Sequence, residues 1–104
     1  MEDKTLYEMC VRVWGIEAQT DMMIEEMSEL TKALLKLRRA HNKPQAIKNS
    51  RLNDLLEEMF DVEFVLNQIK YIYIDNGSDL DKEYYNKIKQ LKMKEVMEKL
   101  GINE

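Results

Sequence analysis

The stretch from residue 52 to residue 74, LNDLLEEMFDVEFVLNQIKYIYI, decides the fold that the sequence predicts. Its first half repeats leucine, methionine and phenylalanine at intervals of three and four residues, the spacing that places side chains on one face of a helix. Its second half is apolar at most positions, and neither Gly nor Pro interrupts it. A helix that is apolar nearly all round belongs in the middle of a bundle, so we expect this helix to be buried on more than one side.

Two helices are predicted before this stretch. A short one, capped by Asp3 or Thr5, should end or bend at Gly15. A long one should run from residue 16 to about residue 39, because its apolar residues recur every three or four positions. That apolar side consists of Met22, Met23, Met27, Leu30, Leu34 and Leu37.

Turn-forming residues separate the predicted helices. Residues 40–50, around the only proline, are expected to form the main loop. Gly77 should close the central helix in the left-handed conformation. Ser78 and Asp81 then resemble a capping box that opens a last helix, which Gly101 stops.

Length and composition favour a single all-α domain over residues 1–104. Hydrophobic residues make up 44% of the chain and charged residues 35%, with three Gly and one Pro, which suits long amphipathic helices. We therefore predict a four-helix-bundle-like domain. A chain this short buries only about two-thirds of its unfolded surface, so we expect a symmetric oligomer, a homodimer or homotetramer, with the apolar second half of the central helix between subunits.

Charge and hydropathy exclude several classes of partner. A net charge of -4 argues against binding of a nucleic acid polymer, which requires clustered Lys and Arg. No apolar run approaches the roughly 18 residues of a membrane span, and no leader-like segment opens the chain. The single cysteine, Cys10, lies among apolar neighbours and is expected to be a packed thiol. The sequence thus predicts a cytoplasmic protein without membrane contact.

An acidic pattern occurs twice, once in each of the two long predicted helices. The first copy is Glu25, Glu26 and Glu29, and the second is Glu57, Glu58 and Asp61. Carboxylates three residues apart share a helix face, so two antiparallel helices would bring four of them together. Such a set repels itself unless cations bind, and oxygen-only ligands favour Mg²⁺, with Mn²⁺ possible.

The alternative is that these acids form solvated helix faces. Ion pairs and hydrogen bonds to neighbours on the same helix, such as Ser28 with Lys32, would then satisfy them. Spacing alone leaves both interpretations open.

At these residues the sequence resembles the MazG-like, all-α nucleoside triphosphate pyrophosphohydrolases. The signature of that superfamily is Glu-Glu-x-x-Glu followed, after a helix-loop-helix gap, by Glu-x-x-Asp. The resemblance includes WGIEAQ at residues 14–19 and covers roughly residues 10–75. It implies a Mg²⁺-dependent enzyme that hydrolyses a nucleoside triphosphate to the monophosphate and pyrophosphate, acting as a dimer or a dimer of dimers.

The resemblance also implies roles for individual residues. Four match metal ligands, and Glu25 matches an acid that binds a further metal or orients water. The four are Glu26, Glu29, Glu58 and Asp61. All five acids are therefore candidate catalytic residues.

Candidate substrate-binding residues lie outside the acidic clusters. Because family members often place Lys, Asn or Arg of the last helix on the phosphates, the candidates there are Asn86, Lys87 and Lys92. The basic residues of the loop, Arg38, Arg39, Lys48 and Arg51, are the alternative. Gln19 shares a helix face with Glu26 and is a candidate for contact with base or sugar. Trp14 is a candidate for stacking on a base, with a core or interface position as the other interpretation.

Two other functions fit the same sequence. One is a phosphoribosyl-ATP pyrophosphohydrolase-like enzyme, which would share the metal-carboxylate chemistry and differ in substrate. The other is a non-enzymatic helical module that dimerises or binds a partner helix, with the acids only maintaining solubility.

Overall fold

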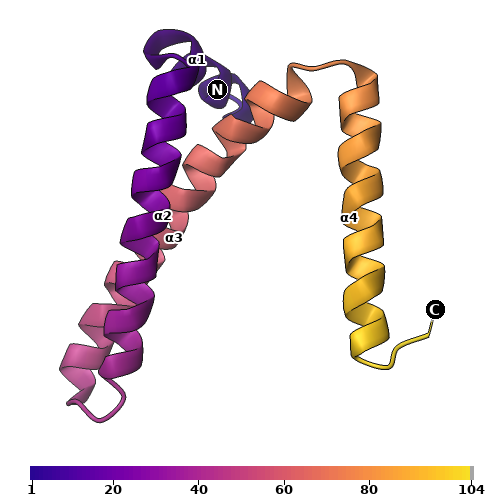
Figure 1. Cartoon of the computed structure of the whole chain (residues 1–104). Helices are drawn as coiled ribbons and strands as arrows, with labels where there is room; N and C mark the ends of the chain where they lie inside the picture. Colours follow the sequence, from indigo (N-terminus) through magenta and orange to yellow (C-terminus); the bar gives the residue numbers. More distant parts are fainter. Residues whose placement is uncertain (104) are drawn as a thin grey trace. The chain divides into compact units, whose positions relative to one another are not determined.

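The computed structural model describes residues 1–103 and, over that range, contains only helices, turns and bends. Figure 1 shows them along the chain. They are α1 (Asp3–Trp14), α2 (Ile16–Arg39), α3 (Gln45–Lys70), the π-helical turn η1 (Tyr71–Asp75) and α4 (Asp79–Lys99). The prediction of an all-α chain is confirmed. The bounds of α2 also match the expected helix.

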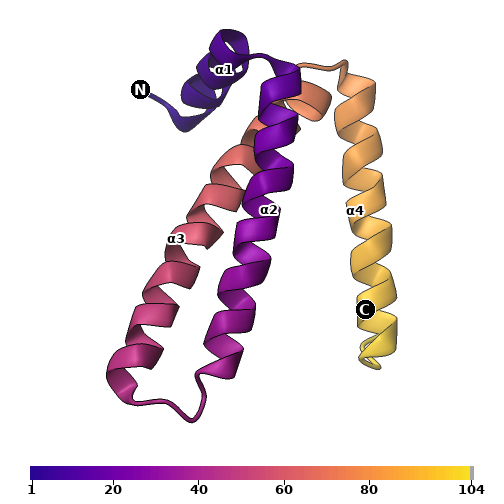
Figure 2. The ribbon, with the colours of Figure 1, turned by 60° about the vertical axis from the view of Figure 1, so that its left-hand side comes forward.

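The helices belong to two compact units, the first ending at Tyr71 and the second beginning at Ile72. In the first unit α2 and α3 form an antiparallel hairpin whose helices lie side by side (Figure 1, Figure 2). α1 packs against both helices of the hairpin. The first unit is thus a small helical bundle, while the predicted single domain over all residues and the predicted symmetric oligomer stay predictions.

Gly15 separates α1 from α2, as expected. Its backbone has φ +94° and ψ 159°, a conformation that is accessible essentially to glycine alone. Its N–H donates to the carbonyl of Val11 at 2.8 Å, and its own carbonyl accepts from the N–H of Gln19 at 3.1 Å. One residue therefore ends α1, starts α2 and changes the direction of the chain.

The expected cap of α1 was wrong. Glu2 occupies the N-cap position, and no side chain caps the helix there. Asp3 is instead the first helical residue, where its negative charge complements the helix dipole.

The turn of the hairpin is shorter than predicted. Residues 45–50 were expected to belong to the loop, but α3 begins at Gln45, directly after Pro44. The carbonyl of Pro44 accepts hydrogen bonds from the N–H groups of Ile47 and Lys48. Proline is compatible with the start of a helix because its missing N–H would have no intrahelical partner there.

The core of the first unit is small and lies mainly between α2 and α3, with α1 covering it at one end. Its buried apolar residues are Cys10, Met23, Ala33, Ala40, Leu55 and Val65. The expectation of a packed thiol at Cys10 is confirmed. Met27 and Leu34 are exposed, so the single apolar side predicted for α2 is divided between an inner face and an outer one.

α3 is not buried on more than one side within the chain. Its buried residues are Leu55, Val65 and Gln68, whereas Leu52, Leu56, Met59 and Phe60 are exposed. The prediction of burial on more than one side is not met within residues 1–103, because α2 and, to a lesser extent, α1 are the helices that pack on α3, and acidic and amide side chains take part of the covered face.

Two predicted features at the boundary of the units were also wrong. Gly77 does not adopt a positive φ, since only Gly15 and Gly101 do so within residues 1–103. The end of α3 is instead followed directly by the π-helical turn η1. Ser78 is the N-cap of α4, but its side chain makes no capping hydrogen bond, so the capping box does not form.

α4 is the main element of the second unit. None of its residues is buried, and its apolar side chains, Tyr84 among them, are exposed. Gly101, with φ +76°, follows the helix and donates its N–H to the carbonyl of Glu98 at 3.1 Å, which confirms its predicted role as a stop. No helix in the described part of the chain is both long enough and apolar enough to cross a membrane.

Candidate metal centre and adjoining pocket

Three carboxylates converge between α2 and α3. Glu26 comes from α2, and Glu58 and Asp61 come from α3, where they are one turn apart on the same face. One oxygen from each lies within 4.8 Å of the other two. The predicted meeting of the two acidic patterns is therefore present with three carboxylates in the group, whereas four were expected.

The charges of this group destabilise one another. Partial burial, followed by the negative charges of Asp61 and Glu58, raises the pKa of Glu26. Burial, and then the charges of Asp61 and Glu29, likewise raises the pKa of Glu58. Burial and like charges both disfavour the ionised form, so the apo site favours uptake of either a proton or a cation.

Glu58 adds a separate observation. Its Oε2 atom is buried and has no hydrogen-bond partner within the described part of the chain. A buried polar atom without a partner is unfavourable, and contact with an ion or a water molecule is a common way to satisfy one. The atom belongs to the converging group, so a cation bound there would satisfy it.

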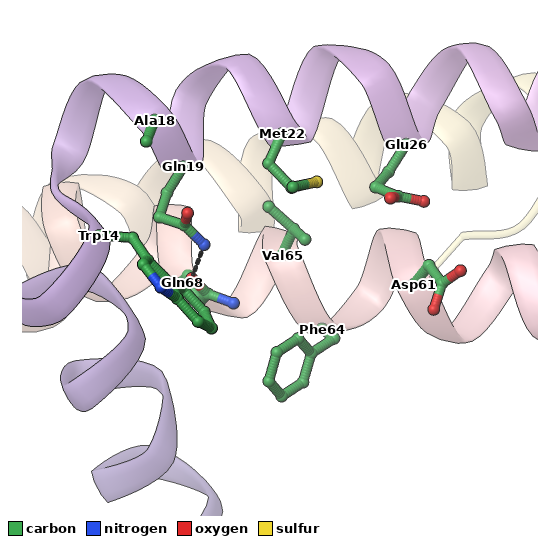
Figure 3. A pocket seen from close by; sticks show the side chains of 9 residues that line it. All are labelled: Trp14, Ala18, Gln19, Met22, Glu26, Asp61, Phe64, Val65 and Gln68. Carbon is green, nitrogen blue, oxygen red and sulfur yellow. Dashed lines mark hydrogen bonds between the residues drawn. The ribbon is translucent and has the colours of Figure 1, made fainter.

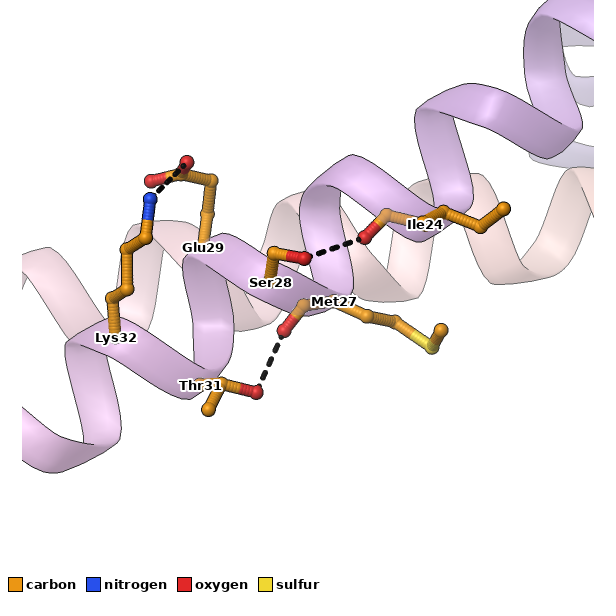
Figure 4. Close-up of polar contacts among 6 residues, drawn as sticks. All are labelled: Ile24, Met27, Ser28, Glu29, Thr31 and Lys32. Atoms are coloured by element: carbon orange, nitrogen blue, oxygen red, sulfur yellow. Dashed lines mark hydrogen bonds and ion pairs between the residues drawn. The ribbon is translucent and has the colours of Figure 1, made fainter.

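Glu29 and Glu25 lie outside the group of three. The carboxylate of Glu29, which is half-buried, pairs with Lys32 one turn further along α2 at 3.3 Å (Figure 4). Glu25 is exposed. For Glu29 the surface interpretation is thus partly correct, although its charge still acts on Glu58.

The hydroxyl groups near Glu29 bond to their own helix. Ser28 donates to the carbonyl of Ile24 at 3.1 Å, and Thr31 donates to that of Met27 at 2.9 Å (Figure 4). The expected pairing of Ser28 with Lys32 is therefore wrong.

A pocket of about 520 Å³ adjoins the carboxylates. Glu26 and Asp61 lie at one end of it, and aromatic, aliphatic and amide side chains form the remainder (Figure 3). The lining residues are Trp14, Ala18, Gln19, Met22, Glu26, Asp61, Phe64, Val65 and Gln68. The predicted pair of Gln19 and Trp14 thus lies beside the same pocket as two of the predicted metal ligands.

Two buried amides stand opposite one another at the other end of the pocket. Gln19 is 4% exposed and Gln68 is 1% exposed. The Nε2 of Gln19 donates to the Oε1 of Gln68 at 2.5 Å (Figure 3). The side-chain oxygen Oε1 of Gln19 and the side-chain amide nitrogen Nε2 of Gln68 keep hydrogen-bonding capacity for a ligand.

Trp14 is 61% exposed although it lines the pocket. It is therefore not a core residue of the first unit, and the stacking role predicted for it stays a prediction. An exposed indole beside a pocket is a suitable platform for a planar ligand.

Sequence reasoning missed Gln68, Phe64 and the side chain of Met22 as pocket residues, while it found Gln19. A signal was available for Gln68. It follows Asp61 by seven residues, as Gln19 precedes Glu26 by seven, so each amide lies two turns from a carboxylate on the same helix face.

The predicted phosphate-binding residues fall into two places. Asn86, Lys87 and Lys92 are exposed on α4, in the second unit, and their role stays a prediction. Around the hairpin turn, Arg39 and Arg51 line a second pocket, of about 230 Å³, with Lys36, Ala40, Lys43 and Ile47.

Comparison with known proteins adds no assignment, because no family model, no curated protein and no solved structure matches this chain.

Proposed function

We propose that the chain is a Mg²⁺-dependent nucleoside triphosphate pyrophosphohydrolase of the MazG-like type, converting a nucleoside triphosphate and water to the monophosphate and pyrophosphate. The observation that carries this proposal is the convergence of Glu26, Glu58 and Asp61, with oxygens within 4.8 Å, at the end of a pocket large enough for a small ligand. The resemblance of the two acidic patterns to the superfamily signature gives the reaction class.

The donor set fits Mg²⁺. All three candidate ligands are carboxylate oxygens, which suit a hard cation better than zinc. The three candidate oxygens lie within 4.8 Å of one another, so side-chain movement would be needed to bring all three onto one cation. Mn²⁺ has the same ligand preferences and is the expected substitute.

Each part of the site has a role in the proposed reaction. Bound Mg²⁺ would supply neutralisation of the triphosphate and acidification of a water molecule for attack at the α-phosphorus. The three carboxylates hold the cation at the end of the pocket. Gln19 and Gln68 present one acceptor and one donor to the edge of a base, and Trp14 offers a face for stacking.

Further parts of the proposal rest on the resemblance. Glu29 would be a fourth metal ligand once released from Lys32, and Glu25 would bind a second metal or orient water. Asn86, Lys87 and Lys92 would contact phosphates.

A homodimer or homotetramer is part of the same proposal. Leu66, in the second half of the central helix that was predicted to lie between subunits, is exposed. Leu56, Met59 and Phe60 of its first half expose further apolar surface that a second copy would cover.

The test is turnover of a panel of ribo- and deoxynucleoside triphosphates with Mg²⁺ or Mn²⁺, resolving monophosphate plus pyrophosphate from diphosphate plus phosphate. Including phosphoribosyl-ATP in the panel separates that alternative substrate. Glu58→Gln should abolish turnover, whereas Glu57→Gln, an adjacent and exposed position with the same change of charge, should retain it.

Formation of diphosphate and phosphate, or equal loss of turnover in both variants, would contradict the proposed reaction.

A non-enzymatic helical module is the second candidate, and the exposed apolar residues favour it. Phe60 is 61% exposed one position before Asp61, so a partner helix could bind beside the carboxylates. This function predicts no turnover and no change of melting temperature on addition of Mg²⁺.

A further inference from the structure

Chemically different sites follow one another along the seam between α2 and α3. The amides and Trp14 come first, then the three carboxylates, and then a small pocket that contains Glu29 and Glu58 together with Lys36. The basic pocket at the hairpin turn comes last and shares Lys36 with the preceding one. The shared residues show that the sites form one continuous series.

The basic pocket lies too far from the three carboxylates to be part of the same cation-binding site. Arg51 precedes Glu58 by seven residues of α3, and Lys36 follows Glu29 by seven residues of α2. Seven helical residues correspond to a rise of about 10 Å. The pocket therefore takes a group that lies beyond the metal centre.

Its lining is cationic and largely unpaired. Lys36, Arg39, Lys43 and Arg51 supply four positive charges, and no acidic residue lines the pocket. Within residues 1–103 only Arg51 of these four makes an ion pair, at 3.9 Å with Asp54. A chain of net charge -4 thus concentrates four cations around one concave surface.

Helix-end electrostatics explain only half of this cluster. Cations in the last turn of α2 complement the carbonyl end of that helix, which accounts for Lys36 and Arg39. Arg51, however, lies in the second turn of α3, and that helix has no acidic residue in its first turn. A positive charge near the N-terminus of a helix is unfavourable on its own, so the position of Arg51 favours an anionic ligand.

We propose that the pocket of Lys36, Arg39, Lys43 and Arg51 binds an inorganic polyphosphate anion. In the proposed reaction, on which this identification rests, that anion is the leaving pyrophosphate, which moves from the carboxylates toward the hairpin turn. Guanidinium groups match the planar pairs of oxygens on phosphate, and ammonium groups add charge without directional demand.

Direct binding of pyrophosphate tests the proposal without reference to turnover. The probe is inorganic pyrophosphate, titrated calorimetrically into the full chain in EDTA, so that no cation bridges the anion to the carboxylates. The test variant is Lys36→Gln/Arg39→Gln. The control is Lys4→Gln/Lys89→Gln, which makes the same change of charge at exposed positions outside the pocket.

We expect the affinity of the test variant to fall about tenfold or more, as for lost hydrogen bonds between charged groups, and that of the control by less than about twofold. Equal losses in the two variants, or no binding by the unaltered chain, would overturn the proposal. Product inhibition by pyrophosphate should weaken in the test variant alone.

The two proposals fail separately. Turnover without metal-free binding of pyrophosphate would retain the hydrolase and reject the basic pocket. Binding that depends on Lys36 and Arg39, in a chain without turnover, would retain the anion site and reject the hydrolase. Glu58→Gln should keep the metal-free affinity in either case, because it leaves the basic pocket intact.

Discussion

Neutralising Glu26 should stabilise the metal-free protein and remove most of its response to Mg²⁺. The oxygens of Glu26 and Asp61 lie within 4.8 Å. Two unit charges at that distance repel by about 0.9 kcal/mol in a water-like dielectric and by about 3.5 kcal/mol at an effective dielectric constant of 20. Because Glu26 is only partly buried, screening by solvent favours the lower figure, and we expect Glu26→Gln to gain about 1 kcal/mol.

The assay is thermal unfolding at pH 7.5, first in EDTA and then in Mg²⁺, with Glu57→Gln as the control. A gain of 1 kcal/mol raises the melting temperature of a domain of this size by about 4–8 °C. Mg²⁺ at ten times its dissociation constant should stabilise the unaltered chain by about 1.4 kcal/mol, and Glu26→Gln by less than about 0.4 kcal/mol. Glu26→Gln should therefore melt above the unaltered chain in EDTA and below it in Mg²⁺.

The reasoning is refuted if Glu26→Gln melts no higher than Glu57→Gln in EDTA, since the converging charges would then be too weakly coupled to matter. It is also refuted if Mg²⁺ raises the melting temperatures of the unaltered chain and of Glu26→Gln equally.

Three further predictions concern the effect of pH on Glu26, the turn at Gly15 between α1 and α2, and the buried amides. The pKa of Glu26 is raised above its ordinary 4.5, so its contribution to stability is fully present below pH 4.5 and is lost as the pH rises through the higher folded value. In EDTA the stability advantage of Glu26→Gln should accordingly grow from pH 4.5 to pH 7 in urea titrations, and a constant difference would contradict this. Gly15→Ala should cost about 1–3 kcal/mol in the same titrations, although nothing lies within 4 Å of the added methyl group, because the backbone conformation there is strained for alanine. A cost near zero would show that the chain relaxes at this turn. Gln68→Leu should cost about 1–3 kcal/mol by leaving the Gln19 amide buried without its partner, and Gln19→Leu in addition should recover part of it. Additive costs in this double-mutant cycle would show that the amide pair is not coupled.

The fold follows from local features of the sequence where those features act alone. Helical periodicity gives the bounds of α2, because Gly15 precedes it and nothing inside interrupts it. The start of α3 could not be read in the same way. Asn49 and Ser50 indicate a loop by residue type. However, Pro44 is compatible with a helix start, and α3 runs from Gln45 through both residues.

The candidate site was predictable to the extent that it depends on spacing along a helix. Two acids three residues apart on α3 had to share a face, and Glu58 and Asp61 do. Which acids of α2 join them depends on how the hairpin is rotated about its axes, and spacing does not determine that. Glu26 is turned toward α3, while Glu29 reaches Lys32 on the surface.

The register of the hairpin supplies a stronger argument for a ligand than any single cluster does. Gln19 donates to Gln68, Glu26 converges with Asp61, and Lys36 lines a pocket with Arg51, so residues of the same chemical type lie together in three layers along the seam. Amides can satisfy one another, whereas acids that lie together, or cations that lie together, repel.

Under the proposed function, a nucleoside triphosphate bound through a cation complements the first two layers, with its base at the amides and its phosphates at the acids. The pyrophosphate that it releases complements the third layer, which lies about 25 Å along α2 from the first. The repulsion among the acids then contributes to the free energy of cation binding, because each charge that destabilises the metal-free protein is a charge that a cation neutralises.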